Sequence, residues 1–207
     1  VAFSYLNFED LNNQVDLLAK KKIDVIICDH HQPSNILPEA YSILNPKQTD
    51  CKYPYKELSG CGVGFKLITA YCIKNTIPFS KISEYLDLLL LSISADLVHM
   101  TGENRILAFF GLKRINTKPR EGIRALLKYL NLQGKIQTSD ISFGLAPRIN
   151  ASGRVSHAKN AVKLLITKDR LLFPYWSKCK KIITKQSKKA KNVSYKLILK
   201  LFFFKKK

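Results

Sequence analysis

Residues 25–34, VIICDHHQPS, place an aspartate and two histidines directly after a short apolar run. The run 25–28 has the length and composition of a buried strand, so Asp29, His30 and His31 lie where the chain leaves the core. Side chains at the carboxyl ends of parallel strands can turn toward a shared ligand. An imidazole and a carboxylate together suit divalent ions such as Mn²⁺. For the tripeptide by itself, a polar turn with hydrogen-bonded histidines is the more frequent explanation.

Apolar spacing and turn residues predict the remaining elements. We expect strands at 23–28 and 41–44, and helices at 9–22, after Gly64 to about 74, 82–97, from Thr101 onward, 120–132 and 159–166. Strands that alternate with helices near the start, followed mainly by helices, predict an α/β fold with a parallel sheet flanked by helices. The expected organisation is a first domain at 1–118, a helical segment at 119–170 and an atypical lysine-rich tail at 171–207.

Composition narrows the class of protein. Hydrophobic residues make up 46% of the 207 residues, which is enough for a packed core. The formal net charge of +20 suits a polyanionic partner, but residues 171–207 contain twelve lysines and no acid and so supply +12 of it. The five cysteines form no CxxC pair and predict reduced thiols in a cytoplasmic protein. The longest apolar run, 85–98, contains two aspartates and predicts a core helix, not a membrane span.

Two further segments could contribute to a site near the DHH tripeptide. Asp96 ends the apolar segment LDLLLLSISAD (86–96), and a buried carboxylate must be paired, capped or bound to a cation. A carboxylate that caps the end of the helix explains Asp96 equally well. In SGCGVG (59–64), Gly60 and Gly62 precede a predicted helix, where backbone N–H groups can approach an anion. Most such segments are simply tight turns, and no Gly-Lys-Ser/Thr follows to make a P-loop.

A fourth segment, APRINASGR (146–154), is predicted to be a loop rich in hydrogen-bond donors. Arg148 and Arg154 bracket Asn150, and the forked guanidinium groups fit phosphate oxygens. Two arginines that bridge acids between sub-domains are the alternative.

Taken in this order and with these intervals, the four segments resemble the DHH phosphoesterase superfamily, and within it the RecJ-type single-strand-specific DNA exonucleases. The resemblance covers about residues 20–170. The matching stretches are IDVIICDHHQPSNILPEAYSILNPKQTDCKYPYKELSGCGVGFKL, ISADLVHMTGENRIL and GLAPRINASGRVSHAKNAVKLL.

The resemblance implies 5′→3′ hydrolysis of single-stranded DNA at a centre with two Mn²⁺ or Mg²⁺ ions. It implies that His30 and Asp96 ligate metal, and that Asp29 and His31 orient the site and contact the scissile phosphate. The candidate nucleic-acid and phosphate contacts are Arg148, Asn150, Arg154, Gly60 and Gly62.

The sequence also departs from the family pattern. The family's first carboxylate motif is expected upstream of residue 1, and its second motif near residues 1–5, where VAFSY contains no acid. The lysine-rich tail shows no glycine-rich nucleic-acid-binding motifs. We therefore expect an internal piece of such an exonuclease, with little activity by itself and with a complementary fragment as a candidate partner. The alternatives are a non-catalytic basic nucleic-acid-binding remnant, a DHH-family oligonucleotide or cyclic-dinucleotide phosphodiesterase, and a fragment that does not fold stably.

Overall fold

The computed structural model describes residues 8–155 and 158–167. The chain divides into two compact units, residues 1–114 and 115–207. The predicted lysine-rich tail lies outside the described residues.

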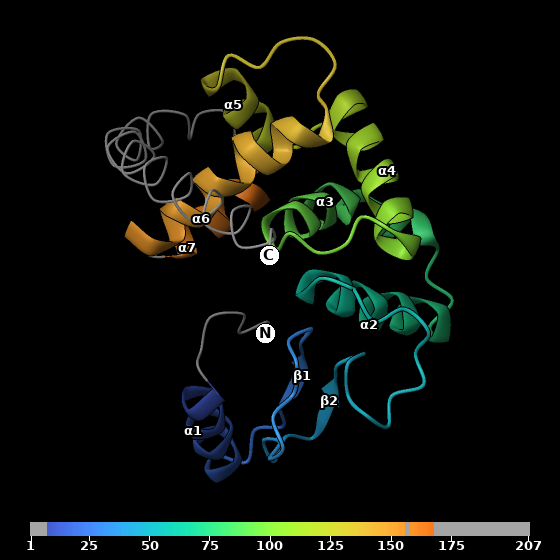
Figure 1. The fold of residues 1–207 in the computed structure, drawn as a ribbon, viewed down its shortest axis with the longest axis vertical. Coiled ribbons are helices and arrows are strands. Elements are labelled where there is room, and N and C mark those ends of the chain that lie inside the picture. Colours follow the sequence, from blue (N-terminus) through green and yellow to red (C-terminus); the bar gives the residue numbers. More distant parts are fainter. Residues whose placement is uncertain (1–7, 156–157, 168–207) are drawn as a thin grey trace, which may run out of the picture. The chain divides into compact units, whose positions relative to one another are not determined.

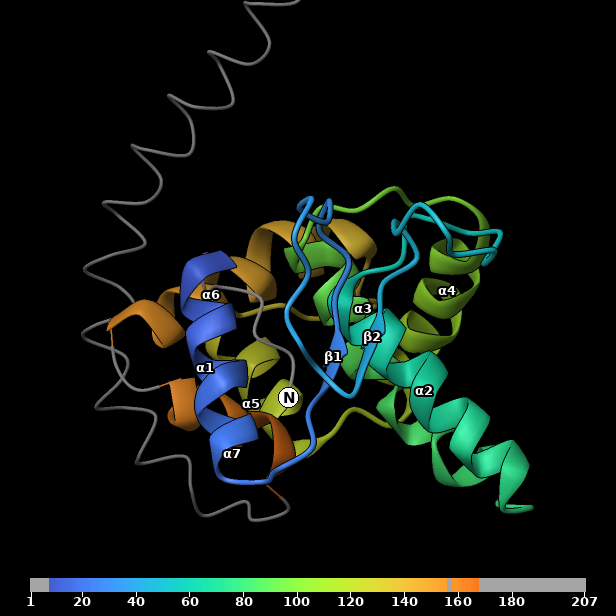
Figure 2. The ribbon, with the colours of Figure 1, turned by 90° about the horizontal axis from the view of Figure 1, so that it is seen from below.

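Two short parallel strands form the sheet of the first unit. β1 (Ile26–Cys28) pairs with β2 (Ser42–Leu44) in parallel register. Helix α1 (Phe8–Lys20) lies beside β1, on the side away from β2 (Figures 1 and 2). The predicted α/β class with a parallel sheet is therefore confirmed. β1 is shorter than the predicted strand 23–28, because its ladder is limited to the three residues that pair with β2.

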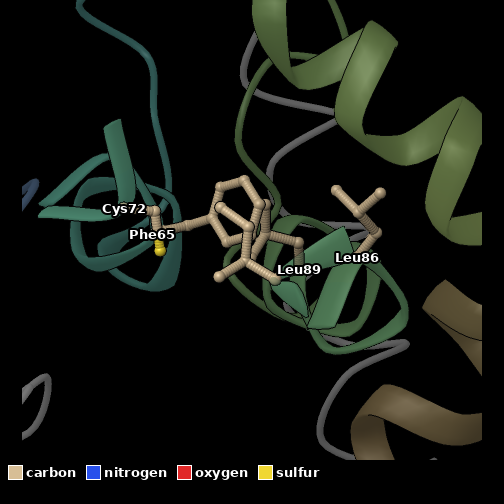
Figure 3. Close-up of a cluster of buried hydrophobic side chains, with 5 residues drawn as sticks. Phe65, Cys72, Leu86 and Leu89 are labelled. Carbon is tan, nitrogen blue, oxygen red and sulfur yellow. The ribbon is translucent and has the colours of Figure 1, made fainter. Parts of the chain in front are cut away.

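The core of the first unit lies between two helices. α2 (Gly60–Lys74) and α3 (Leu86–Ala95) bring apolar side chains into the same buried space, as Figure 3 shows. Burying a leucine, isoleucine or phenylalanine side chain contributes about 1.5–3 kcal/mol, so this contact fixes both helices and the loops at their ends. The cluster consists of Phe65, Cys72, Ile82, Leu86 and Leu89.

α3 is shorter than the predicted helix 82–97. Two single 3-10 turns, Phe79–Lys81 and Ser83–Tyr85, come before it. The helix ends at Ala95 because Leu97 has a positive φ of 52°, a left-handed backbone conformation that interrupts the right-handed helix. The chain therefore reverses immediately after Asp96.

α4 (Gly102–Thr117) begins where the sequence predicted a helix and crosses α3 at a glycine. A Cβ atom at Gly111 would overlap the carbonyl oxygen of Leu86, so only glycine permits this approach. Beside the crossing, Arg114 Nε lies 3.8 Å from Asp87 Oδ2, and the Asp87 side chain is fully buried. A buried carboxylate depends on such a partner, because an uncompensated charge is costly to bury.

Three further helices lie among the described residues of the second unit, and its arginine-bearing segment corrects a prediction. Residues 146–154 were expected to form a loop but belong to a helix that follows a wide π-helical turn. Pro147 lacks the N–H that an α-helical ladder needs, and the wide turn before it accommodates that gap. The elements are α5 (Glu121–Tyr129), the π-helical turn Asp140–Leu145, α6 (Ala146–Val155) and α7 (Ala158–Ile166).

A close backbone approach joins α5 to α7. A Cβ atom at Gly122 would overlap the carbonyl oxygen of Leu164, and Arg120 Nη1 donates to the carbonyl oxygen of Leu165 at 3.2 Å. None of the helices in the described part of the chain is long and apolar enough to cross a membrane. The cysteines within that part, Cys28, Cys51, Cys61 and Cys72, are free thiols, as predicted.

Replacing Gly111 by alanine should destabilise the chain, because the new methyl group must push α4 away from α3. Overpacking of this kind costs about 1–3 kcal/mol, more than the helix propensity that alanine regains. Urea denaturation followed by circular dichroism gives the free energy of unfolding. Gly64→Ala on α2 is the matched control, since a methyl group added there would meet nothing within 4 Å, and it should leave stability unchanged or raise it. Equal stability of the two variants would contradict the close crossing.

Candidate metal centre

The DHH turn begins at the carboxyl end of β1. The backbone N–H of Asp29 donates to the carbonyl oxygen of Leu44 at 3.0 Å, which extends the parallel ladder one residue beyond the strand. His30 follows and is 8% exposed, whereas the His31 side chain is 56% exposed. The parallel pairing therefore directs one histidine into the protein and leaves the other accessible.

Asn45, at the carboxyl end of β2, fixes the same turn from the neighbouring strand. Its Nδ2 donates to the carbonyl oxygen of His31 at 2.9 Å, and its Oδ1 accepts from the backbone N–H of Lys47 at 3.0 Å. Asn45 is 5% exposed, so these bonds satisfy a buried amide. The sequence analysis did not identify this role of Asn45. The signal that could have revealed it is an amide at the same sheet edge as the histidines.

Asp29 and His31 form a pair within the turn. The carboxylate atom Oδ1 of Asp29 lies 2.7 Å from Nδ1 of His31 and accepts from its backbone N–H at 3.3 Å. Partial burial opposes ionisation of Asp29, but hydrogen bonds with the His31 side chain and with the backbone of His30 and His31 outweigh it and lower the pKa of the carboxyl group. The contact fixes the orientation of the exposed imidazole and makes its Nε2 the free ring nitrogen.

His30 meets Asp96 across the first unit. Nε2 of His30 lies 3.8 Å from Oδ2 of Asp96, too far for a direct hydrogen bond. Ser92, one turn earlier on α3, donates to the same Oδ2 atom at 3.2 Å. Burial lowers the pKa of His30 and outweighs the opposing effect of the Asp96 charge. The imidazole is therefore neutral at neutral pH, which is the form that can bind a metal ion.

The amino-terminal turn of α2 covers the His30 ring. A Cβ atom at Gly60 would lie 3.3 Å from Cδ2 of His30, so a side chain there would press on the imidazole. Ser59 caps the helix, and its Oγ accepts from the N–H of Gly62 at 3.2 Å. The glycines predicted to precede a helix thus lie inside it. The N–H of Gly62 is engaged by this cap, and phosphate binding by Gly60 and Gly62 stays a prediction.

Cys61 lies within electrostatic reach of Asp96. Its side chain keeps an exposed surface, yet the surrounding protein atoms desolvate the thiol, and the Asp96 charge adds to the effect. Together they raise the pKa of Cys61 to about 11. The thiol is therefore protonated at neutral pH, which leaves the imidazole and the carboxylate as the available donors.

The donor set suits a divalent ion but is small. Among the described residues, no group of three or more His, Cys, Asp and Glu side chains is arranged to hold a metal. His30 and Asp96 nevertheless fit one ion as a pair. Two donors each about 2.1 Å from an ion lie about 3.0 Å apart when at right angles and about 4.2 Å apart when opposite, which brackets their 3.8 Å separation. A neutral imidazole with a carboxylate is also a combination that Mn²⁺ accepts.

The first turn of α4 is bound to the loop before α2. Glu103 accepts from the hydroxyl of Tyr53 at 2.7 and 2.9 Å and forms an ion pair with Nζ of Lys66 at 2.8 Å. The hydroxyl of Tyr55 donates to the carbonyl oxygen of Thr101 at 2.7 Å. The segment that follows Asp96 is thereby held against the segment that precedes α2.

The predicted strand-binding residues of the arginine-bearing segment belong to the second unit. Arg148 is half-buried, and its Nη1 donates to the carbonyl oxygen of Gly144 at 2.7 Å. Asn150 is also half-buried. The backbone of Arg154 lies in α6, and its side chain falls outside the described residues. The role of these three residues in binding stays a prediction.

A scan against family models matches residues 7–93 to the N-terminal domain of the DHH family. This segment, which includes the DHH turn and most of α3, is therefore similar to the N-terminal domain of the DHH family.

The curated relatives that match the chain include two RecJ exonucleases. The chain is 43% identical over 148 residues to the single-stranded-DNA-specific exonuclease RecJ of Bacillus subtilis, and 40% identical over 155 residues to that of Escherichia coli. These matches cover 71% and 70% of this chain but only 18% and 27% of the two relatives. The chain is thus similar to these two RecJ proteins and spans about a quarter or less of the length of each.

Solved structures agree with the sequence relatives. A crystal structure of exonuclease RecJ bound to manganese matches with a TM-score of 0.76 and 27% identity, covering 94% of this chain and 49% of that one. RecJ from Thermus thermophilus in complex with Mn²⁺ matches with a TM-score of 0.75 and 26% identity, covering 93% of this chain and 28% of that one. The fold and the family resemblance are confirmed.

The ion pair at the start of α4 predicts a pH-dependent contribution to stability. Partial burial alone lowers the pKa of Lys66, but its contacts with Glu103 and Tyr53 outweigh burial and raise it above 10.5. A raised folded-state pKa stabilises the fold below the unfolded-state value, and this stability is lost as pH rises through the folded-state pKa. Lys66→Met should therefore lower stability at neutral pH by at most about 1 kcal/mol, because the pair is partly solvated. The difference from the unsubstituted chain should shrink as the pH rises beyond the ordinary lysine value of about 10.5.

Urea denaturation of both proteins across this pH range measures the difference. Lys52→Met is the matched control, since Lys52 is an exposed lysine beside Tyr53, and it should show no such trend. A Lys66→Met difference that is independent of pH would contradict the electrostatic origin.

Proposed function

We propose that this chain carries part of the metal centre and strand-binding surface of a Mn²⁺- or Mg²⁺-dependent exonuclease that degrades single-stranded DNA in the 5′→3′ direction. The observation that carries the proposal is the meeting of a neutral imidazole at His30 with the carboxylate of Asp96 at 3.8 Å. The relatives in the RecJ branch, whose solved structures contain Mn²⁺ or Mg²⁺, support the same assignment.

In the proposed mechanism, His30 and Asp96 hold one divalent ion, and Ser92 orients the carboxylate. When bound, such an ion polarises a phosphodiester oxygen and lowers the pKa of an attacking water. Asp29 holds the accessible His31 in one orientation, so that its other ring nitrogen can contact the scissile phosphate. In this proposal the DHH turn supplies a buried metal ligand, His30, and an exposed phosphate contact, His31.

The proposed strand contacts come from the two glycine- and arginine-bearing segments. Arg148 offers further guanidinium N–H donors besides the one used on Gly144, and guanidinium groups bind phosphate oxygens in a planar, paired geometry. We assign the same class of contact to Asn150 and Arg154. Gly60 and Gly62 lie at the amino-terminal end of α2, where the helix dipole favours an anion.

Removing either proposed ligand should weaken Mn²⁺ binding, because the ion loses one of two protein donors. Electron paramagnetic resonance distinguishes free from bound Mn²⁺ during titration of the full chain. His30→Ala and Asp96→Ala should each reduce the affinity by at least about tenfold. His99→Ala is the matched control, since His99 is an exposed histidine three residues after Asp96, and it should bind as the unsubstituted chain does. Unchanged binding in the first two variants would refute the proposed pair.

A second candidate function, a basic nucleic-acid-binding protein without catalysis, is favoured by the net charge of +20. Both candidates predict that the full chain binds single-stranded DNA with an affinity that falls steeply with salt, through counterion release. With two donors among the described residues, we also propose little or no hydrolysis by this chain. Fluorescence anisotropy and gel analysis of one 5′-phosphorylated oligonucleotide with MnCl₂ measure both properties. Robust hydrolysis abolished by His30→Ala would reject the non-catalytic candidate, and salt-independent binding would reject both.

A further inference from the structure

Asn104, in the first turn of α4, joins two loops through its side-chain amide. Nδ2 donates to the carbonyl oxygen of Glu57 at 2.5 Å and to the carbonyl oxygen of His99 at 2.9 Å. The residue is fully buried. Both N–H groups of the amide are therefore used on backbone carbonyls from different parts of the chain, and the separation of these two loops is limited by the size of one amide group.

Each of the two loops contains a residue that lies close along the chain to the His30–Asp96 pair or to a residue packed against it. Glu57 comes three residues before Gly60, which packs against the His30 imidazole. On the other side, His99 comes three residues after Asp96. The two carbonyl oxygens that Asn104 joins are thus only a few residues along the chain from Asp96 and from the glycine that packs against His30.

The helix turn that carries Asn104 is itself immobilised. Its neighbour Glu103 is held by Lys66 from α2 and by Tyr53 from the loop before α2. At Gly102, which has a positive φ of 46°, a side chain would collide with the ring of Tyr55. The backbone that carries Asn104 is therefore held in place by these contacts. A residue that positions its partners requires such support.

Within the described part of the chain, the buried amide of Asn104 uses its donors but not its acceptor. Oδ1 of Asn104 is buried and has no hydrogen-bond partner among the described residues. A buried acceptor without a partner is costly; an apolar side chain of the same shape avoids that cost but withdraws the Nδ2 donors from the carbonyl oxygens of Glu57 and His99. The directional use of the two Nδ2 hydrogens is the feature of Asn104 that an apolar side chain lacks.

We propose that Asn104 is a positioning residue that sets the separation of His30 and Asp96 and thereby the affinity of the pair for a divalent ion. The inference rests on the proposed metal pair. In this proposal Asn104 does not contact the ion. It affects metal binding by orienting the residues that do, as residues beside metal ligands do in other proteins. Replacing such residues typically weakens metal binding about 10–100-fold.

Paramagnetic broadening of imidazole signals by MnCl₂ tests the role in the full chain. The chain contains four histidines, so the His30 signal can be assigned by single substitutions. Asn104→Leu keeps the approximate volume and removes both donors. It should require about tenfold more Mn²⁺ for the same broadening at His30. A loss of fold would affect every histidine signal, whereas loss of positioning changes the Mn²⁺ dependence of His30 while the dispersed spectrum persists.

Asn116→Leu is the matched control. Asn116 Nδ2 donates to the carbonyl oxygen of Ile136 at 3.0 Å, and its Oδ1 accepts from the N–H of Ile136 at 2.8 Å, so its amide also joins a helix to a loop. It belongs to the second unit, and its substitution should leave the Mn²⁺ dependence of His30 unchanged. A tenfold loss in this control as well would overturn the proposal, because it would make the effect a general consequence of destabilisation.

The remaining outcomes separate the inference from the function on which it rests. Absence of broadening at His30 in the unsubstituted chain would overturn the proposed metal pair itself. Broadening that is the same in the unsubstituted chain and in a folded Asn104→Leu variant would overturn the positioning role alone. Asn104→Ala serves if the leucine variant does not fold, because it adds no new apolar group beside the carbonyl oxygens. Unfolding of both variants would identify Asn104 as a determinant of folding and overturn the positioning role.

Discussion

The parallel pairing of β1 with β2 is the constraint on which the rest of the site depends. It continues one residue past β1, through the hydrogen bond from Asp29 to Leu44, so that the DHH turn starts at the edge of the sheet. Asn45, at the end of the neighbouring strand, then fixes the turn by donating to His31. Two three-residue strands would be marginal alone. The two strands contribute to the site through their parallel direction. Because parallel strands end at the same edge of the sheet, the residues that follow them lie close together.

Burial of His30 at that edge of the sheet determines the protonation state of its imidazole. The packing of Gly60 against His30 removes the imidazole from water and keeps it neutral, while the nearby carboxylate of Asp96 keeps contact with solvent. Apolar contacts between α2 and α3 hold the two helices that bring these groups together (Figure 3). The hydrogen bonds of Asn104 then limit how far the loops next to them can separate. Core packing, loop geometry and ligand chemistry are therefore linked in one unit of the chain.

Sequence reasoning could predict the residues of the site better than their local structure. His30 and Asp96 were singled out as polar residues at the ends of apolar runs, and the family resemblance implied that both ligate metal; the fold brings them within 3.8 Å. Asn45 and Asn104 were missed, because their partners are backbone carbonyl oxygens of residues distant in sequence, which leave no pattern. The glycine segment lies within α2, and the arginine segment lies in α6 after a wide turn. Glycine and proline signalled loops there, but tertiary packing favoured helices.

The most direct test of the central claim is an anomalous difference map from crystals of the full chain soaked in MnCl₂. The account predicts a manganese peak within bonding distance of both His30 Nε2 and a carboxylate oxygen of Asp96. A well-occupied peak elsewhere on the protein, with none between these two residues, would contradict it.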